Sequence, residues 1–321
     1  MMNASIIYAL LAAALFGAST PLAKMMVGEL PPVLLAGLLY LGSGIGLAAV
    51  RLLRDRGWQS FGLARSGWPW LLGAIFFGGI LGPILLMFGL TRTSSAAASL
   101  LLNVEAAFTA LLAWVVFKEH ADRRIVLGMA AIMVGGVVLS WPSGASGSSG
   151  WIGPLAVVAA CLCWAIDNNL TRHVSASDAL FIAGSKGLIA GVVNTALAFS
   201  LGASLPTATT LMQAMAVGLF GYGVSLVLFM LALRGLGAAR TGAYFSTAPF
   251  VGVAAALILL GESTSPAFWL AAALMGMGVW LHLTERHEHE HVHEAQGHPP
   301  SHAPIIHSHP HFPDIHHRHR H

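Results

Sequence analysis

Residues 76–90, FFGGILGPILLMFGL, form an uncharged run in the first half of the chain, and a related run, LFGYGVSLVLFMLAL, occupies residues 219–233. FFGG aligns with LFGY and LLMFGL aligns with LFMLAL, and the offset is 143 residues in both cases. The same offset aligns FKE at residues 117–119 with LGE at residues 260–262. The order and constant spacing of these matches predict an internal repeat.

The composition places this repeat in a membrane. Hydrophobic residues make up 56% of the 321 residues and charged residues only 9%, whereas an ordinary soluble domain has roughly 25% charged residues. Uncharged runs of roughly 20 residues are long enough to cross a hydrocarbon core about 30 Å thick as helices. The net charge of +3 belongs to loops and the chain end, and it gives no reason to propose nucleic acid as a partner. Cys161 and Cys163 both lie in an apolar run, which excludes a disulfide framework.

We predict an all-α integral membrane protein of about ten transmembrane helices. Breaks rich in Gly, Pro, Ser or Arg separate the expected spans, which lie near residues 4–27, 33–53, 68–90, 95–117, 124–141, 151–171, 178–201, 210–233, 240–260 and 266–283. The expected organisation is a first five-helix repeat in residues 1–141, a Gly/Ser linker in residues 142–150, a second five-helix repeat in residues 151–284 and a disordered, His-rich tail in residues 285–321.

The two halves are expected to be inverted relative to each other. LFGASTPLAK from Leu15 aligns with CWAIDNNLTR from Cys163, so that Lys24 matches Arg172. An odd number of helices per repeat makes the second copy enter the membrane from the opposite side. With the amino terminus in the cytoplasm, the outer connectors hold only Lys24 and Arg92, and the other Arg and Lys residues of the connectors are cytoplasmic. This bias predicts a multi-pass protein of the cell membrane with both termini in the cytoplasm.

Three ionisable side chains lie within the predicted spans, namely Glu105, Asp167 and Lys186. A charge at such a position costs about 2.5–3.5 kcal/mol on insertion scales and commonly marks a transport pathway. We therefore predict that these residues take part in transport or coupling, and Glu105 is the candidate proton carrier because a carboxyl group can change charge there. The alternatives are a structural ion pair of Lys186 with Asp167 or Glu105, and a structural bond of Glu105 with Asn103.

Polar residues cluster around Asp167 in the sixth predicted span. Trp164, Asn168 and Asn169 could hydrogen-bond a polar solute, and we predict them as substrate-binding residues. Capping of the helix end is an equally good interpretation of the two asparagines.

Prolines and glycines interrupt the other apolar runs. Pro21, Pro83 and Pro249 free backbone carbonyls that a substrate could use, although a packing kink is the commoner meaning. Close contact between helices is the expected role of Gly78, Gly79 and Gly82.

The end of the chain is rich in histidine, since 14 of the 16 histidines occur from His282 onward. Neutral imidazoles bind zinc, nickel, copper and cobalt, and we predict transition-metal binding by the tail, with an inert low-complexity tail as the alternative. A purification tag does not explain the irregular spacing and the interleaved Glu and Pro. The candidate ligands are His287, His289, His291, His293, His307, His309, His311, His316, His317 and His319.

The sequence contains no G-x-x-x-x-G-K, no H-E-x-x-H and no nucleophile elbow, so neither ATP-driven pumping nor proteolysis has a motif behind it. Residues 4–283 resemble the drug/metabolite transporter superfamily, specifically the EamA type. The resemblance rests on FGASTPLAK, FKE, CWAIDNNLTR, the AGSKGLIAG around Lys186, and STAPF before LILLGE. It implies two five-helix repeats, transport of metabolites such as amino acids, nucleosides or sugars, and no enzymatic activity. The chain departs from the usual repeat at Glu105 and Ala106, where a Pro like Pro249 is commoner.

The leading hypothesis is a gradient-driven secondary transporter of a small metabolite, with a central cavity between the repeats and alternating access. The second hypothesis is a nickel, cobalt or zinc exporter that collects ions on its tail, and the third is a membrane-anchored metal buffer or sensor that transports nothing. The expected partners are a small solute, the lipid bilayer, protons as coupling ion, nickel, zinc or cobalt ions, and a second copy of the chain. No cofactor is expected to be required.

Overall fold

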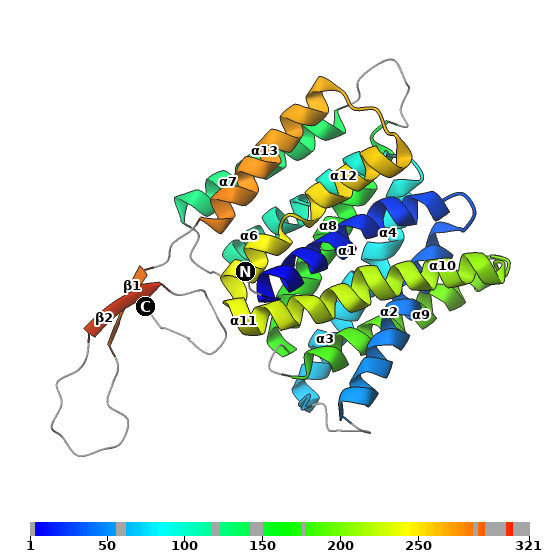
Figure 1. Ribbon diagram of the computed structural model, residues 1–321, viewed down its shortest axis with the longest axis horizontal. Helices are drawn as coiled ribbons and strands as arrows, with labels where there is room; N and C mark the ends of the chain where they lie inside the picture. The colour runs from blue at the N-terminus through cyan, green and yellow to red at the C-terminus, as the bar shows by residue number, and fades with distance from the viewer. Residues whose placement is uncertain are drawn as a thin grey trace.

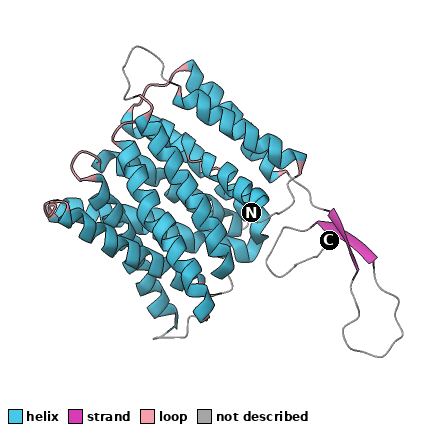
Figure 2. Cartoon of the chain, turned by 180° about the vertical axis from the view of Figure 1, so that it is seen from behind, coloured by secondary structure: helices cyan, strands magenta, loops and turns pink. Residues whose placement is uncertain are grey.

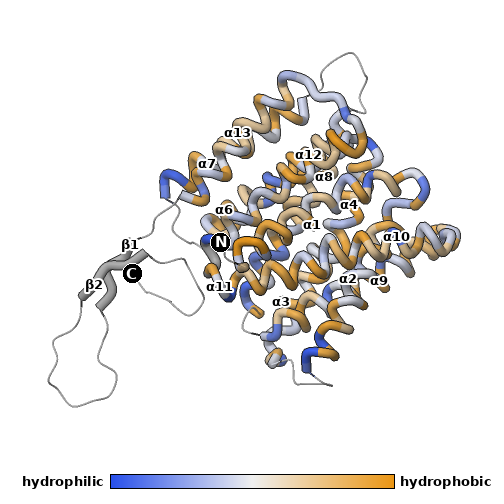
Figure 3. The backbone as a smooth tube through the Cα atoms, viewed as in Figure 1, coloured by the Kyte–Doolittle hydropathy of each residue, from blue (hydrophilic) through white to orange (hydrophobic). Residues whose placement is uncertain are grey.

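The computed structural model describes residues 4–55, 62–116, 122–141, 150–174, 177–284, 288–292 and 306–310. Within these ranges, ten helical segments are long and apolar enough to cross a membrane, and they pack side by side in one bundle (Figure 1). The predicted spans are confirmed, and their boundaries differ from the prediction by no more than three residues. Hydrophobic residues run along the helices, and the most hydrophilic ones gather near helix ends (Figure 3).

The first half of the bundle consists of five spans. They are α1 (Ala4–Met26), α2 (Pro32–Asp55), a third span made of η1 (Arg65–Gly67), α3 (Trp68–Ala74), η2 (Ile75–Leu81) and α4 (Gly82–Leu90), a fourth made of α5 (Ser95–Leu101) and α6 (Val104–Val115), and α7 (Arg123–Ser140).

The second half repeats this arrangement. Its elements are α8 (Ile152–Thr171), η3 (Arg172–Val174), α9 (Ala179–Ser200), α10 (Ala208–Gly218), η4 (Leu219–Val224), α11 (Ser225–Phe245), α12 (Ala248–Leu260) and α13 (Pro266–Leu283). The eighth span ends at Leu236 and the ninth begins at Arg240, both within α11. Beyond the bundle, β1 (Glu288–Val292) and β2 (Ile306–Pro310) pair as antiparallel strands (Figure 2).

Consecutive spans run in opposite directions, so the two ends of the bundle can be named from their residues. We call the end that carries Lys24, Leu90 and Leu260 the Lys24 end. The opposite end, which carries Arg51 and Thr171, is the Arg51 end.

An irregular backbone feature occurs at the same place in both halves. Both η2 and η4 are short π-helices, in which the N–H of Gly82 donates to the carbonyl of Phe77 and the N–H of Ser225 donates to the carbonyl of Phe220. These two bonds are related by the offset of 143 residues that relates the sequence matches. A π-bulge is rare and often functional, so its duplication supports the repeat independently of composition.

The halves meet along α2 and α9, which pack together without intervening side chains. A methyl group at Gly44 would collide with the backbone of Gly187 and Leu188, and one at Gly191 would collide with the backbone of Leu41. Gly44 and Gly191 are 147 residues apart, as are Leu41 and Leu188. The contact of Gly44 with Leu188 therefore corresponds to the contact of Gly191 with Leu41. This correspondence is what a two-fold relation between inverted repeats requires.

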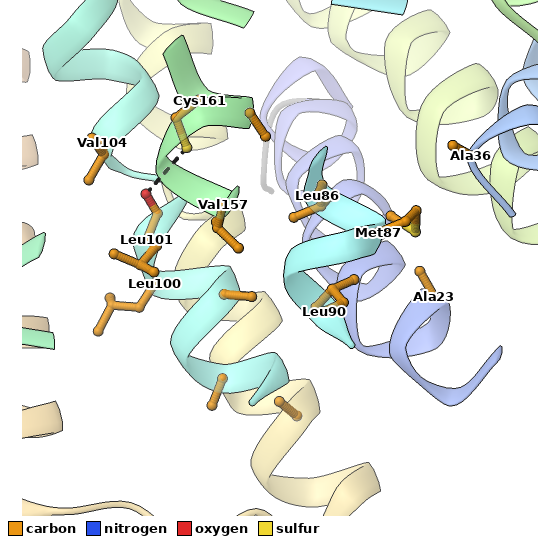
Figure 4. Packing of buried hydrophobic residues seen from close by; sticks show 14 of the residues in the cluster. Ala23, Ala36, Leu86, Met87, Leu90, Leu100, Leu101, Val104, Val157 and Cys161 are labelled. Atoms are coloured by element: carbon orange, nitrogen blue, oxygen red, sulfur yellow. Dashed lines mark hydrogen bonds between the residues drawn. The ribbon is translucent and has the colours of Figure 1, made fainter. Parts of the chain in front are cut away.

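The fourth and ninth spans are both broken near the middle. The N–H of Asn103 donates to the carbonyl of Leu100, and the N–H of Thr247 donates to the carbonyl of Tyr244, each at 3.2 Å and over three residues instead of four. Such tightening ends one half-helix and begins another. The carbonyl of Leu101 at the first break lies 3.5 Å from the buried Cys161 thiol (Figure 4).

Candidate functional site

The three ionisable residues predicted within the spans lie on neighbouring helices. Glu105 occupies the first turn of α6, where its carboxylate is near the positive end of the half-helix dipole. Asp167 lies in the last turns of α8, and Lys186 lies in the second turn of α9. The break between α5 and α6 therefore sets where Glu105 enters the bundle.

Lys186 and Asp167 form an ion pair inside the bundle. The Lys186 Nζ lies 2.6 Å from each carboxylate oxygen of Asp167, and the Thr171 hydroxyl donates to Asp167 Oδ1 at 2.9 Å. The Asp167 side chain is only 7% exposed. Of the two acids that the sequence offered to Lys186, the structure selects Asp167, and each charge of the pair neutralises the other.

The π-helix η2 packs against this ion pair. A methyl group at Gly78 would collide with the Asp167 carboxylate, which confirms the predicted close contact at this glycine. The Gly78 carbonyl accepts hydrogen bonds from the Tyr40 hydroxyl at 2.7 Å and from Trp164 Nε1 at 3.0 Å. Trp164 is thus bound to the backbone of the third span, in contact with the site.

Glu105 is bonded to Asn168 rather than to Asn103 or Lys186. Asn168 Nδ2 donates to Glu105 Oε1 at 2.8 Å and lies 3.4 Å from the Thr109 hydroxyl, whereas Asn103 Nδ2 donates to the carbonyl of Leu100. Sequence reasoning missed this pairing because it joins two helices whose residues are 63 positions apart. Thr109, one turn after Glu105 on the same face of α6, is the signal that could have indicated a polar face toward α8.

Neither asparagine side chain caps the end of α8. Asn169 Nδ2 donates to the Ala165 carbonyl at 2.9 Å and lies 3.3 Å from the Thr109 carbonyl. At the helix end, the N–H of Arg172 bonds to the backbone carbonyl of Asn168. The side chains of Asn168 and Asn169 therefore connect α8 to α6.

The exposed surface of Asn168 faces the interior of the bundle. Cys161 and Val157, which lie seven and eleven residues earlier on the same face of α8, are both fully buried. The exposed leucines of this helix, Leu155 and Leu162, lie on another face, as expected for contact with lipid. Because Asn168 is exposed on a protein-facing side, it borders a space within the bundle.

The residues on the Lys24 side of this site are more deeply buried than those on the Arg51 side. On the Lys24 side, residues with no more than 2% exposure belong to one packed hydrophobic cluster; they include Ala23, Leu86, Met87, Leu90, Leu100, Leu101 and Val157 (Figure 4). On the other side, Thr109 and Thr171 are half-buried and Val116 is exposed. Burial around Glu105 and Asn168 therefore decreases from the Lys24 end toward the Arg51 end.

The Lys24 end is held by two charged residues from different halves. The Lys24 ammonium donates to the carbonyls of Leu90 and Thr93, the latter at 2.9 Å. The Glu262 carboxylate accepts from the backbone N–H groups of Ser95 and Ala96, each at 2.7 Å. Both side chains thus hold the connector between α4 and α5.

The described part of the tail contains four of the ten histidines predicted as metal ligands. His287, His293, His311, His316, His317 and His319 lie outside the described residues, as does the linker in residues 142–149. His289, His291, His307 and His309 lie in β1 and β2, which are described by their backbone alone.

Elsewhere, the described part of the chain offers no group of three or more His, Cys, Asp or Glu side chains that could hold a metal ion. His282 belongs to the last turn of α13, where its Nε2 lies 3.1 Å from the Ile125 carbonyl. It therefore packs α13 against α7 and is separate from the tail.

A bundle of ten candidate membrane spans with charged residues in its interior is typical of a membrane transporter. The chain belongs to the EamA-like transporter family, whose model matches residues 3–141 and 151–284. This match confirms the resemblance found in the sequence.

Two curated relatives and one solved structure are similar to this chain. The chain is 28% identical over 281 residues to an uncharacterized transporter of Methanothermobacter thermautotrophicus, covering 83% of this chain and 82% of the relative. It is 36% identical over 107 residues to a probable 4-amino-4-deoxy-L-arabinose-phosphoundecaprenol flippase subunit ArnE of Pseudomonas fluorescens, covering 33% of this chain and 90% of the relative. A solved structure described only as the crystal structure of a protein matches with a TM-score of 0.64 and 19% identity, over 88% of this chain and 96% of that chain. The last similarity concerns the fold alone.

Proposed function

We propose that this protein is a secondary transporter that moves a small solute across the membrane by alternating access, driven by an ion gradient. The observation that carries the proposal is the charged site of Glu105, Asp167 and Lys186, which lies inside the bundle where helices of the two halves meet. A site of this kind between inverted repeats is the arrangement that alternating access requires.

The repeat itself supports function over a structural role for these charges. The positions related to Asp167, Lys186 and Glu105 by the offsets of 148, 147 and 143 residues are Ser19, Leu39 and Ala248. Gly221 packs against Ser19 as Gly78 packs against Asp167, so the same backbone contact forms with a neutral side chain. The fold is therefore built with neutral residues at the related positions, and burying charged residues costs free energy. The charges of Glu105, Asp167 and Lys186 are thus better explained by function than by a need of the fold.

Alternation follows from the same symmetry. Lys24 and Glu262 hold the connector at the Lys24 end, and their counterparts in the repeat are Arg172 and Glu119, the latter outside the described residues. We expect Arg172 and Glu119 to hold the connector between the eighth and ninth spans when the Arg51 end closes. Each half would then exchange its role with the other.

In this proposal Glu105 is the coupling residue, and Lys186 with Asp167 forms the ion pair that shapes the binding site beside Trp164, Asn168 and Asn169. A carboxyl group inside a bundle is neutral when protonated and charged when it is not, so it can exchange a proton for a solute. With both termini in the cytoplasm, as the distribution of Arg and Lys predicts, the Arg51 end faces the cytoplasm.

A transition-metal exporter is the second candidate, and the observation that favours it is the concentration of 13 histidines in the tail from His287 onward. In that case the tail would collect nickel, cobalt or zinc ions for the bundle. A metal buffer or sensor that transports nothing is the third candidate, and it rests on the tail alone.

The test begins with a growth screen of a deletion strain against metals and metabolites, which identifies the solute. Purified protein in liposomes should then accumulate that solute when a pH gradient is imposed and should lose the accumulation when a protonophore collapses the gradient. Accumulation that needs ATP, or that is indifferent to every imposed ion gradient, would contradict the proposal.

A further inference from the structure

The charges of the site do not cancel. Lys186 is engaged by both carboxylate oxygens of Asp167, each at 2.6 Å, and this pair is neutral. The Glu105 carboxylate has Asn168 as its hydrogen-bond partner, and among the described residues no Lys, Arg or His lies within ion-pair distance of it. The ionised site therefore carries one uncompensated negative charge.

Two acceptor atoms at Glu105 and Asn168 have no hydrogen-bond partner among the described residues. Asn168 uses its Nδ2 on Glu105 and Thr109, so its Oδ1 is left to accept, as is the second oxygen of Glu105. The Lys186 ammonium directs two of its three N–H groups at Asp167. A solute that supplies donors and a positive charge fits these groups, and an anion would meet two carboxylates.

A metal ion fits the site less well than an organic cation does. Within the described ranges, no three His, Cys, Asp or Glu side chains converge, so Glu105 and the Asn168 amide would provide too few ligands for a transition metal. An ammonium group needs acceptors for only three N–H bonds. The Trp164 indole lies one turn before Asn168 on the same face of α8, and the Tyr40 hydroxyl shares the Gly78 carbonyl with it. These rings offer an aromatic surface beside the acceptors, which favours an organic cation.

We propose that the transported solute carries an ammonium group, which binds between the Glu105 carboxylate and the Asn168 amide oxygen with its carbon skeleton against Trp164. This inference rests on the proposed function, because it names the class of solute for the same site. It also assigns Asn168 as a residue that contacts the solute directly.

The test uses carbodiimide modification of Glu105 in the purified full-length protein, followed by mass spectrometry of its peptides. Four probes are compared at equal concentration, namely phenethylammonium, 2-phenylethanol, phenylacetate and Ni²⁺. Glu29, an exposed acid in the connector after α1, provides the internal control. A ligand at about twice its Kd slows modification of its site about threefold, because only the free site reacts.

We expect phenethylammonium to slow modification of Glu105 about threefold or more at a concentration of about twice its Kd, and to leave Glu29 unchanged. The alcohol and phenylacetate, which have the same ring without the cation, should have no effect on Glu105. In Asn168→Ala, the protection by phenethylammonium should weaken while Glu105 remains reactive.

Absence of protection by phenethylammonium would overturn the inference, as would equal protection by 2-phenylethanol or stronger protection by phenylacetate or Ni²⁺. The outcome is separable from that of the proposed function. Protection by the ammonium probe without any gradient-driven accumulation would support the ammonium-binding site and contradict gradient-driven transport. Accumulation of a solute without protection of Glu105 by phenethylammonium would support gradient-driven transport and contradict the inference that the solute carries an ammonium group.

Discussion

Lys24 and Glu262 come from opposite halves of the chain and hold the same connector, the turn between Leu90 and Ser95. The Lys24 ammonium donates to the carbonyls of Leu90 and Thr93. The Glu262 carboxylate accepts from the N–H groups of Ser95 and Ala96, which follow the turn. Glu262 therefore joins the two halves at this end of the bundle, and Lys24 fixes the connector within the first half.

Loss of Lys24 should open this end more often. A hydrogen bond to a charged group contributes about 1.5–3 kcal/mol, and about 1.4 kcal/mol is tenfold in population. Ser99 is 1% exposed and contacts Gly252 of the other half, so Ser99→Cys reports opening. In a background with Cys161→Ala and Cys163→Ala, we expect Lys24→Met and Glu262→Gln to raise the rate of maleimide labelling roughly tenfold. Glu29→Gln, the same chemical change at an exposed acid, is the control, and equal labelling in all variants would show that the connector is not a gate.

Glu105→Gln should separate coupling from folding. Glutamine keeps the size of the side chain and its bond to Asn168, but it cannot exchange a proton. We expect normal insertion and loss of solute accumulation against a gradient in proteoliposomes, while exchange down the solute gradient continues. Glu29→Gln should accumulate solute as the wild type does. Full accumulation by Glu105→Gln would show that Glu105 is not the coupling residue. Asp167 would then be the remaining candidate, or the proton-coupling hypothesis would have to be abandoned.

Lys186→Met should lower stability because it leaves Asp167 buried and unpaired. Removing one partner of a buried pair costs about 3–5 kcal/mol, and the yield of folded protein should fall accordingly in size-exclusion chromatography. The double variant Asp167→Ser with Lys186→Leu copies the neutral residues Ser19 and Leu39 of the other half. We expect it to recover folded protein without transport. A double variant that transports at the wild-type rate would make the ion pair purely structural.

Removal of residues 285–321 discriminates among the three functions. The full chain should bind several Ni²⁺ or Zn²⁺ ions at neutral pH and release them below about pH 5.5, because imidazoles protonate near their pKa of about 6.5. The truncated protein should lose this binding in calorimetry and keep transport. Loss of transport for metals alone would favour the exporter, and loss of every activity would favour the buffer or sensor. No binding by the full chain would make the tail inert.

A reporter fused after Leu283 tests the orientation. The bias of Arg and Lys toward one set of connectors predicts cytoplasmic ends, and an even number of spans places both termini on the same side. The fusion should be active with a cytoplasmic reporter and inactive with a periplasmic one. The reverse pattern would invert the assignment of the Arg51 end.

The spans and the repeat could be predicted from the sequence because both depend on local composition and on spacing along the chain. The offset that aligns FFGG with LFGY also aligns the π-helices, yet nothing in these glycine-containing runs reveals that the helix widens there. That change depends on partners from other helices, such as Tyr40 and Trp164 at the Gly78 carbonyl.

The site could be predicted as a set of residues but not as a set of pairs. Charges within apolar spans identified Glu105, Asp167 and Lys186, because their cost is apparent from sequence. Their partners depend on which helix faces meet, so the bond between Glu105 and Asn168 was missed. Glu262 was noticed as part of a repeated motif, whereas its role at the α5 terminus required the fold.

The contact of α2 with α9 limits how the halves can move. Gly44, Gly187 and Gly191 bring the backbones of the two helices together without side chains that could repack. Sliding one helix along the other would therefore break these backbone contacts, and no side chain could fill the gap. In the proposed alternating access, rotation about the line of these contacts would keep them while one end of the bundle opens and the other closes. The line where these glycines meet would thus be the axis of rotation. A single methyl group added there should prevent the rotation, although it touches neither the proposed solute site at Glu105 nor the contacts of Lys24 and Glu262.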